Sequence, residues 1–173
     1  MLATAREATI DADSALEQLY AAHYAGLVRL AVLLLRDQGL AEDVVQDSFV
    51  ALHRRWDHVD PDRAPAYLRQ TVVNRSRSAQ RHRGVVTRHR PEPLPDGAAA
   101  DESVLVAERR TAVLDALAAL PTRQREVLVL RYYLDFSEAD IATTLGISRG
   151  AVKSHASRAA AALRSRLSPQ EDA

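Results

Sequence analysis

Apolar residues recur at intervals of three and four along most of the chain, with polar residues between them. This spacing is typical of amphipathic helices that bury one face. The first run follows Ser14 and Glu17, whose separation is that of a capping box at a helix start. Residues 1–13 show no strong period and are expected to be disordered. The pattern predicts helices over about residues 15–35, 41–55, 65–83, 104–119 and 121–133.

The segment Phe136–Leu163 has the local features of a helix-turn-helix. Ser137 stands three residues before Asp140, which is a second capping-box spacing, so a helix is expected to begin directly after Ser137. Gly146 suits the turn because glycine adopts a positive φ without steric cost. Ser148 is then placed to cap the second helix.

Helical spacing separates an apolar face from a basic face in this second helix. The expected inward residues are Val152, Ala156, Ala159 and Leu163. The expected outward residues are Gly150, Lys153, Ser154, Ser157 and Arg158. Short and cationic side chains suit the major groove of DNA. An ordinary helical hairpin with a solvated basic side would also show this pattern, but its cap, glycine and basic face would then coincide by chance.

Residues 84–103 break every helical period and carry proline at positions 91, 93 and 95. This composition predicts a flexible linker that is locally stiff in the polyproline form. About 20 such residues could span up to roughly 65 Å when extended. The linker divides a first domain, residues 14–83, from a second, residues 104–167, and residues 168–173 form a tail. The predicted fold is therefore all-α, with two small helical domains joined by a flexible, proline-rich linker.

The composition narrows the chemistry. The 173 residues include no cysteine, which excludes disulfides, thiolate metal sites and cysteine catalysis. His53 and His58 do not have the spacing of a metal site, and no phosphate-binding loop or nucleophile motif occurs, so no metal, cofactor or enzymatic activity is expected. No apolar run approaches the roughly 20 residues of a membrane span, and the N-terminus is too polar for a signal peptide. The protein is expected in the cytoplasm, without membrane insertion.

The formal net charge of zero hides an alternation along the chain. Residues 1–62 hold 11 acids and 5 bases, and residues 63–90 hold 8 arginines and no acid. Residues 91–140 hold 10 acids and 5 bases, and residues 141–173 hold 5 bases and 2 acids. Two separated basic blocks favour two contacts with a polyanion. Two solvated basic faces remain the alternative.

The predicted helix over residues 65–83 gathers amide and guanidinium groups on one stripe. The stripe holds Gln70, Asn74, Arg77, Ser78 and Arg81. Such groups hydrogen-bond base edges and phosphates, and no carboxylate is expected near enough to neutralise them. Arg75 borders the apolar side through its aliphatic stem. For Arg81 and Arg83 a basic helix end that gains from the macrodipole is an open alternative, whereas Asn74 has a propensity cost and no capping role.

The predicted helix over residues 41–55 has the opposite character. Asp43 and Asp47 lie four residues apart on one face beside Gln46. Like charges at this spacing destabilise a helix by a few tenths of a kcal/mol. Docking of a basic protein partner would explain the acidic face, and a merely solvated face explains it equally well.

Three segments, taken together and in this order, resemble the extracytoplasmic-function (ECF, group 4) class of sigma-70 sigma factors. AEDVVQDSFVALHRRW resembles region 2.2, PAYLRQTVVNRSRSAQRHR resembles regions 2.3 and 2.4, and LPTRQREVLVLRYYLDFSEADIATTLGISRGAVKSHASRAAAALR resembles region 4. The resemblance covers about residues 14–167. It implies two small helical domains and a promoter-specificity subunit of bacterial RNA polymerase.

The resemblance also implies a role for each candidate residue. The residues matched to core polymerase binding are Asp43, Gln46 and Asp47. Those matched to the −10 promoter element are Gln70, Asn74, Arg75, Arg77 and Arg81, with Asn74 helping to capture an extruded base. Those matched to the −35 element are Ser148, Arg149, Lys153, Ser154 and Arg158. Regulation by an anti-sigma protein that clamps the two domains is a further expectation from the family.

Two other classes of function stay open from the residues themselves. A stand-alone helix-turn-helix transcriptional regulator with a helical sensor domain would bind its operator without polymerase. A helical enzyme would need its His and Asp residues gathered in one concave site, which their dispersed positions do not favour.

Overall fold

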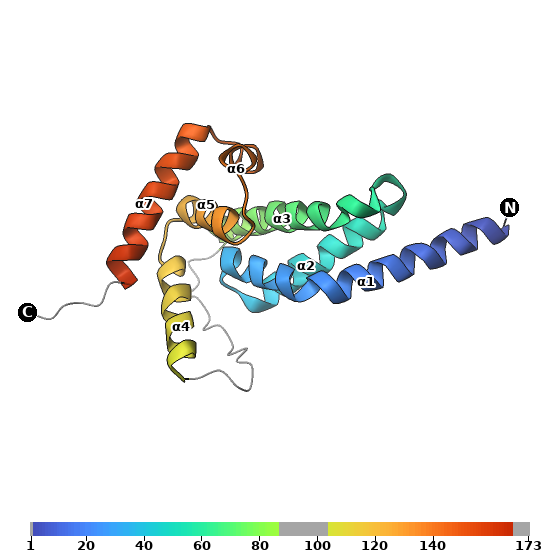
Figure 1. Cartoon of the computed structure of the whole chain (residues 1–173), viewed down its shortest axis with the longest axis horizontal. Helices are drawn as coiled ribbons and strands as arrows, with labels where there is room; N and C mark the ends of the chain where they lie inside the picture. The colour runs from blue at the N-terminus through green and yellow to red at the C-terminus, as the bar shows by residue number, and fades with distance from the viewer. Residues whose placement is uncertain (1, 87–103, 168–173) are drawn as a thin grey trace, which may run out of the picture. The chain divides into compact units, whose positions relative to one another are not determined.

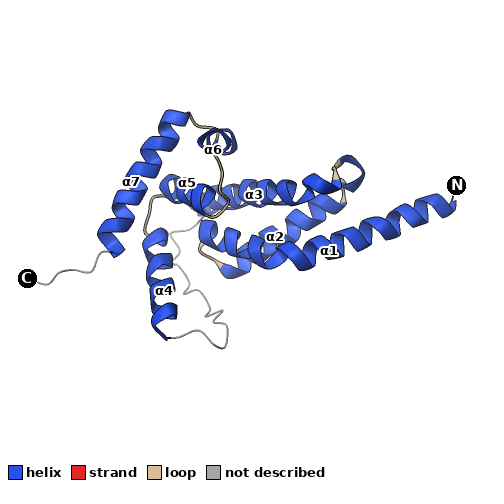
Figure 2. Ribbon diagram, viewed as in Figure 1, coloured by secondary structure: helices blue, strands red, loops and turns tan. Residues whose placement is uncertain are grey.

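The computed structural model describes residues 2–86 and 104–167 of the chain. It divides into two compact units, Met1–Glu92 and Pro93–Ala173. Every regular element of the described residues is helical (Figure 2). The all-α prediction with two small helical domains is confirmed. Of the predicted linker only residues 84–86 are described, and they continue a helix; the rest of the linker and the predicted tail at residues 168–173 lie outside the described residues.

Over residues 2–86, the first unit has three long helices that pack against one another (Figure 1). Its elements are α1 (Leu2–Leu35), α2 (Gln38–His53), η1 (Trp56–His58), η2 (Pro61–Arg63) and α3 (Ala64–Val86). Its core is aliphatic and includes Leu30, Ala31, Leu34, Val45, Leu52, Leu68, Val72 and Val73. Ser48 is buried in this core, and its hydroxyl donates to the Val44 carbonyl at 2.7 Å. The Gln80 amide donates to the Leu34 carbonyl at 2.6 Å, which satisfies an acceptor in the last turn of α1.

Helix α1 begins at Leu2, which is earlier than the expected start near residue 15. The segment that precedes Ser14 contains Ala, Arg and Glu but no Gly or Pro. Once a helix is nucleated, each further residue of this kind adds a backbone hydrogen bond at little cost. Ser14 therefore lies inside the helix and does not start it.

Helix α2 also begins earlier than its apolar period predicts. Asp37 is its N-cap, and the Asp37 carboxylate accepts from the Leu40 amide at 2.8 Å. The Asp-Gln-Gly segment that broke the period is thus the cap and first turn of the next helix. Arg36, between α1 and this N-cap, adopts a positive φ of 61°, which lets the chain turn from α1 into α2.

Among the described residues, one helical segment, Asp13–Leu35 of α1, has the length and apolar composition of a membrane span. This differs from the expectation that no segment would approach that length. The same segment supplies Leu27, Leu30 and Leu34 to the core of the first unit. A core helix of a globular unit meets the same length and hydropathy criteria.

Residues 104–167 of the second unit form four helices, with α7 packed against each of the other three. They are α4 (Val104–Ala118), α5 (Thr122–Tyr132), α6 (Glu138–Leu145) and α7 (Arg149–Leu167). The largest fully buried side chains are Val127, Leu130, Ile141, Leu145 and Val152. The buried Arg125 guanidinium donates to the carbonyls of Ala118 and Leu120 at 3.3 and 3.2 Å. It thereby satisfies acceptors where α4 ends.

Substitution of two glycines tests how the turn between α6 and α7 is held. Gly146 has a φ of +64° and no atom within 4 Å of an added Cβ, so Gly146→Ala meets backbone strain and no clash. We expect a loss of about 1–2 kcal/mol of unfolding free energy. Gly150→Ala, in the helical first turn of α7, should cost nothing or stabilise by less than about 1 kcal/mol.

Urea unfolding of the full chain followed by far-UV circular dichroism measures both substitutions. The only tryptophan of the sequence is Trp56, in the first unit, so its fluorescence transition should be unchanged in both variants. Equal losses for the two alanine variants would contradict the assigned role of the Gly146 conformation.

Candidate nucleic-acid interface

The first helix of the helix-turn-helix begins with the predicted capping box. The Asp140 amide donates to the Ser137 hydroxyl oxygen at 3.2 Å, and the Ser137 amide donates to the Asp140 carboxylate at 3.3 Å. Ser137 Oγ also donates to the same carboxylate at 2.5 Å. Because this box satisfies amides that the helix leaves unpaired, it fixes where α6 begins.

The turn into α7 also follows the prediction. Gly146 ends α6 in the left-handed conformation, and its amide bonds back to α6 carbonyls. Ile147 donates to the Ala142 carbonyl at 3.0 Å, which completes a Schellman-type end. Ser148 Oγ then accepts from the Ala151 amide at 3.1 Å and caps the start of α7.

The two faces of α7 separate as predicted. Val152, Ala156 and Ala159 are buried, and the half-buried Leu163 packs against a cluster that includes Ala159. The exposed residues on the other side are Ser148, Arg149, Gly150, Lys153, Ser157 and Arg158, with Ser154 half-buried. The Arg158 guanidinium donates to Ser154 Oγ at 2.8 Å, which brings together two of the predicted DNA-binding residues. One face of α7 is therefore cationic and lined by short side chains.

The face of α3 predicted to bind DNA is exposed at Asn74 and Arg81. Leu68 and Val72 are fully buried, while Asn74 on the other side is exposed. The Gln70 amide donates to the Asn74 side-chain oxygen at 3.2 Å. This contact fixes the orientation of the Asn74 amide, whose NH₂ group then points away from Gln70.

The basic side chains of α3 are less uniform than predicted. Arg81 is exposed and donates to Ser78 Oγ at 3.0 Å, whereas Arg77 is half-buried. Arg75 is also half-buried, as expected for a residue on the border of the apolar side.

One ion pair joins a basic side chain of α3, outside the predicted stripe, to a carboxylate of another helix. Arg75 Nη1 of α3 donates to the Asp47 carboxylate of α2 at 3.2 Å. The two residues are 28 positions apart, so helical periodicity could not reveal the contact. The pair joins a residue matched to polymerase docking with a residue matched to DNA binding.

The predicted acidic face of α2 is present on the surface. Asp43, Gln46 and Asp47 are all exposed, and Val50 continues the same stripe with 48% of its area exposed. Sequence reasoning missed Val50, although an apolar residue at an outward helical position was a visible signal. A face that combines carboxylates with an exposed aliphatic residue is suited to a protein partner.

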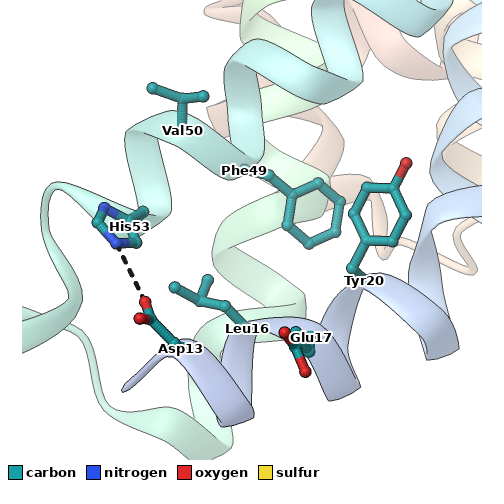
Figure 3. Close-up of a pocket in the computed structure, with 7 residues that line it drawn as sticks. All are labelled: Asp13, Leu16, Glu17, Tyr20, Phe49, Val50 and His53. Carbon is teal, nitrogen blue, oxygen red and sulfur yellow. Dashed lines mark ion pairs between the residues drawn. The ribbon is translucent and has the colours of Figure 1, made fainter. Parts of the chain in front are cut away.

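Beside this stripe lies an open groove of about 440 Å³ between α1 and α2 (Figure 3). It is lined by Asp13, Leu16, Glu17, Tyr20, Phe49, Val50 and His53. His53 Nε2 is 3.5 Å from the Asp13 carboxylate across it, so this histidine pairs with a carboxylate from α1. Within the described part of the chain, no three His, Asp or Glu side chains gather at metal-binding distance.

Aromatic stacking supports the α1 side of the groove. The Tyr20 and Tyr24 rings stack at 4.5 Å, and the Tyr20 ring lies 5.2 Å from Phe49. Burial and the neighbouring Tyr20 raise the pKa of Tyr24 above 10.0, while a hydrogen bond with Gln46 opposes the rise. The Tyr24 phenol thus contacts Gln46, one of the three polar residues of the acidic face of α2.

The fold and its surfaces define a DNA-binding protein with a helix-turn-helix in one unit and a second polar, basic helix in the other. Residues 19–85 match Sigma-70 region 2, and residues 110–163 match Sigma-70, region 4. The chain belongs to the sigma-70 family, among the ECF RNA polymerase sigma factors.

Relatives match most of the chain. The RNA polymerase sigma-E factor of Streptomyces avermitilis is 36% identical over 84% of this chain and 80% of its own length. The ECF RNA polymerase sigma factor SigL of Mycobacterium tuberculosis is 39% identical over 84% of this chain and 85% of its own length.

Two solved structures have a similar fold. The sigma factor RpoE, in its complex with the anti-sigma factor NepR from Bartonella quintana, has a TM-score of 0.71 at 26% identity and covers 89% of this chain and 97% of its own. CnrH, in complex with the cytosolic domain of CnrY, has a TM-score of 0.61 at 30% identity, with coverages of 92% and 96%. A sigma factor that directs transcription initiation is therefore confirmed, and the stand-alone regulator is not favoured because the first unit matches region 2.

A double-mutant cycle tests the contact between α2 and α3. The changes are Asp47→Asn, Arg75→Gln and the two combined. Because the Asp47 side chain is 68% exposed and the Arg75 side chain 40% exposed, we expect a coupling of only about 0.2–1 kcal/mol at low salt. Molar salt should remove most of it. Urea unfolding followed by Trp56 fluorescence provides the measurement, and additive effects at low salt would show that the pair does not form.

Proposed function

We propose that this ECF sigma factor, a member of group 4, binds core RNA polymerase through the exposed face of α2 and contacts the promoter at two elements. Helix α3 meets the −10 element, and α7 meets the −35 element. The observation that carries the proposal is that α2, α3 and α7 each bury an apolar face and expose part of a polar one. The polar face is acidic in α2 and basic in α3 and α7. The protein acts in the cytoplasm and performs no catalytic chemistry of its own.

The docking surface is Asp43, Gln46 and Asp47, extended by Val50. The two carboxylates on the exposed face of α2 attract a basic partner at long range. Val50 adds apolar area at short range, which charge alone does not supply. Asp47 is already paired with Arg75, so Asp43 carries the unshared charge of this surface.

The surface for the −10 element is Gln70, Asn74, Arg75, Arg77 and Arg81. The exposed Asn74 amide, oriented by Gln70, offers both a donor and an acceptor for the edge of a base. Extrusion of a base from the stack costs a few kcal/mol. The arginines of α3 would hold the backbone phosphates while polymerase supplies the remainder of the opening energy.

The surface for the −35 element is Ser148, Arg149, Lys153, Ser154 and Arg158. Ser148 caps the start of α7, and the other four residues lie in its first ten positions. The start of a recognition helix is the part that enters the major groove. The short side chains of Gly150 and Ser157 let the helix approach the base edges. Arg149, near the helix start, and Arg158, farther along it, provide cations for bases and phosphates at two positions.

We extend one partner from the similar structures to this chain. RpoE is solved with the anti-sigma factor NepR, and CnrH with the cytosolic domain of CnrY. An anti-sigma protein that covers the α2 face would exclude polymerase from the same carboxylates. This protein has no cysteine, so thiol chemistry that releases such a partner would have to occur on the partner.

The docking assignment predicts that Asp43→Lys weakens core polymerase binding by at least about tenfold, or about 1.4 kcal/mol. The exposed Glu108→Lys on α4 makes the same charge change outside the α2 face and should bind as the wild type. Fluorescence anisotropy with labelled core polymerase measures the affinity. Unchanged binding of the folded Asp43→Lys variant would remove this face from the docking role.

Promoter-directed transcription with core polymerase tests the function itself. Sequencing RNA 5′ ends after overexpression identifies the promoters and both elements. On these templates the chain should stimulate initiation over core alone. A gel shift without polymerase should show weak binding, whereas tight, polymerase-independent binding to a palindrome would indicate a stand-alone regulator.

The −10 assignment predicts that Asn74→Ala weakens holoenzyme binding to the single-stranded −10 element about five- to tenfold, the loss of one hydrogen-bonded base contact. Binding to a duplex that carries only the −35 element should be unchanged, which controls for folding and for assembly with core. Equal losses on both DNAs would show that Asn74 supports the fold or the assembly and does not contact the −10 base.

A further inference from the structure

Glu138 of α6 lies close to one basic side chain of α5 and one of α7. It is the first residue of α6. Glu138 Oε1 lies 3.7 Å from Arg131 Nη1 of α5, and Glu138 Oε2 lies 3.8 Å from Lys153 Nζ of α7. The carboxylate is about three-quarters buried, with 24% of its side chain exposed, whereas the side chain of Lys153 is 68% exposed.

The position of Glu138 gives the carboxylate two stabilising contacts that do not involve DNA. The amides of the first turn of α6 favour a negative charge there. Arg131, which is 38% exposed, supplies the opposite charge from α5. The neighbouring Asp140 carboxylate is occupied by the capping box with Ser137. Glu138 is thus anchored on one side and meets the basic face of α7 on the other.

Glu138 and a DNA phosphate would compete for the ammonium group of Lys153. A long ammonium side chain that approaches a phosphate must give up a carboxylate partner or share its charge with it. The freed carboxylate then takes up counterions from solution, which offsets part of the counterion release that drives DNA binding. With a neutral residue at position 138, Lys153 would lose no carboxylate partner on binding DNA, and no counterion would be taken up there.

We propose that Glu138 is a positioning residue that holds Lys153 in the free protein and thereby sets the strength and the salt dependence of DNA binding by α7. The proposal rests on the −35 role proposed for Lys153. Exposed ion pairs are worth less than about 1 kcal/mol, so the restraint corresponds to a factor of about two to five in affinity. Such a restraint weakens phosphate attraction without touching the residues that read bases.

The test uses the holoenzyme and a duplex that carries the −35 element and no −10 element. We expect Glu138→Gln to bind about two- to fivefold more tightly than the wild type at low salt. The plot of log affinity against log salt should become steeper by up to about one ion. Glu108→Gln, an exposed change of the same chemistry on α4, should leave both quantities unchanged.

Lys153→Met separates failure of this inference from failure of the proposed function. In a Lys153→Met background, Glu138→Gln should have no further effect on affinity or on the salt slope. If Lys153→Met weakens binding but Glu138→Gln behaves as the wild type or binds more weakly, the restraint is overturned and the −35 role of Lys153 stands. If Lys153→Met itself leaves −35 binding unchanged, the proposed role of Lys153 is overturned and the restraint falls with it.

A folding effect is distinguished by circular dichroism of each variant. Glu138→Ala removes the same charge with a smaller side chain and should reproduce the steeper salt slope. A variant that lost affinity through unfolding would show a lowered unfolding midpoint and no steeper salt dependence. If both Glu138 variants behaved in this way, the proposed restraint on Lys153 would also be overturned.

Discussion

Burial of one face of a helix is the constraint on which both candidate DNA surfaces depend. In α3, Leu68 and Val72 are fully buried, and in α7, Val152 and Ala159 are fully buried. Burial of a large aliphatic side chain stabilises a domain by about 1.5–3 kcal/mol, far more than any exposed polar contact contributes. The apolar faces therefore decide the rotation of each helix about its axis. Asn74 and Lys153 are exposed as a consequence, and their own interactions need contribute little to stability.

The polar faces are held by weak contacts. Asp47 and Arg75 join α2 to α3, while Glu138 meets Arg131 and Lys153 in the second unit. Each of these pairs has at least one partner with more than a third of its side chain exposed, so each is worth little in water. A weak pair orients a cation before DNA arrives and is readily exchanged for a phosphate. Strong, buried pairs would give the same orientation but would resist the exchange.

Local chemistry was sufficient to predict the helix-turn-helix. The capping box at Ser137, the left-handed turn at Gly146 and the cap at Ser148 each depend on side chains within four residues, so sequence spacing reveals them. The start of α1 was missed because its first residues contain no breaker and the helix continues through Ser14. Helical propensity, unlike a cap, has no sharp boundary.

Contacts between helices were beyond the reach of sequence periodicity. Arg75 reaches Asp47 across 28 positions, and nothing in either helix alone identifies the partner of the other. The same holds for Glu138, whose two cations come from different helices. Sequence periodicity could propose residues for the candidate surfaces, but it could not identify the carboxylates that pair with Arg75 and Lys153.

The division into two units has an energetic consequence for promoter recognition. Neither α3 nor α7 alone offers more than about five predicted DNA-contacting residues, so each surface by itself gives modest affinity and modest discrimination. A tether converts the second contact into an intramolecular event whose effective concentration is set by tether length and stiffness. From composition alone, the predicted linker, with prolines at positions 91, 93 and 95, is expected to be stiffer than a glycine-rich segment of equal length. A stiff tether favours promoters in which the two elements lie at one spacing and penalises others. With such a linker, we expect part of the specificity to depend on the distance between the elements and not on any base contact.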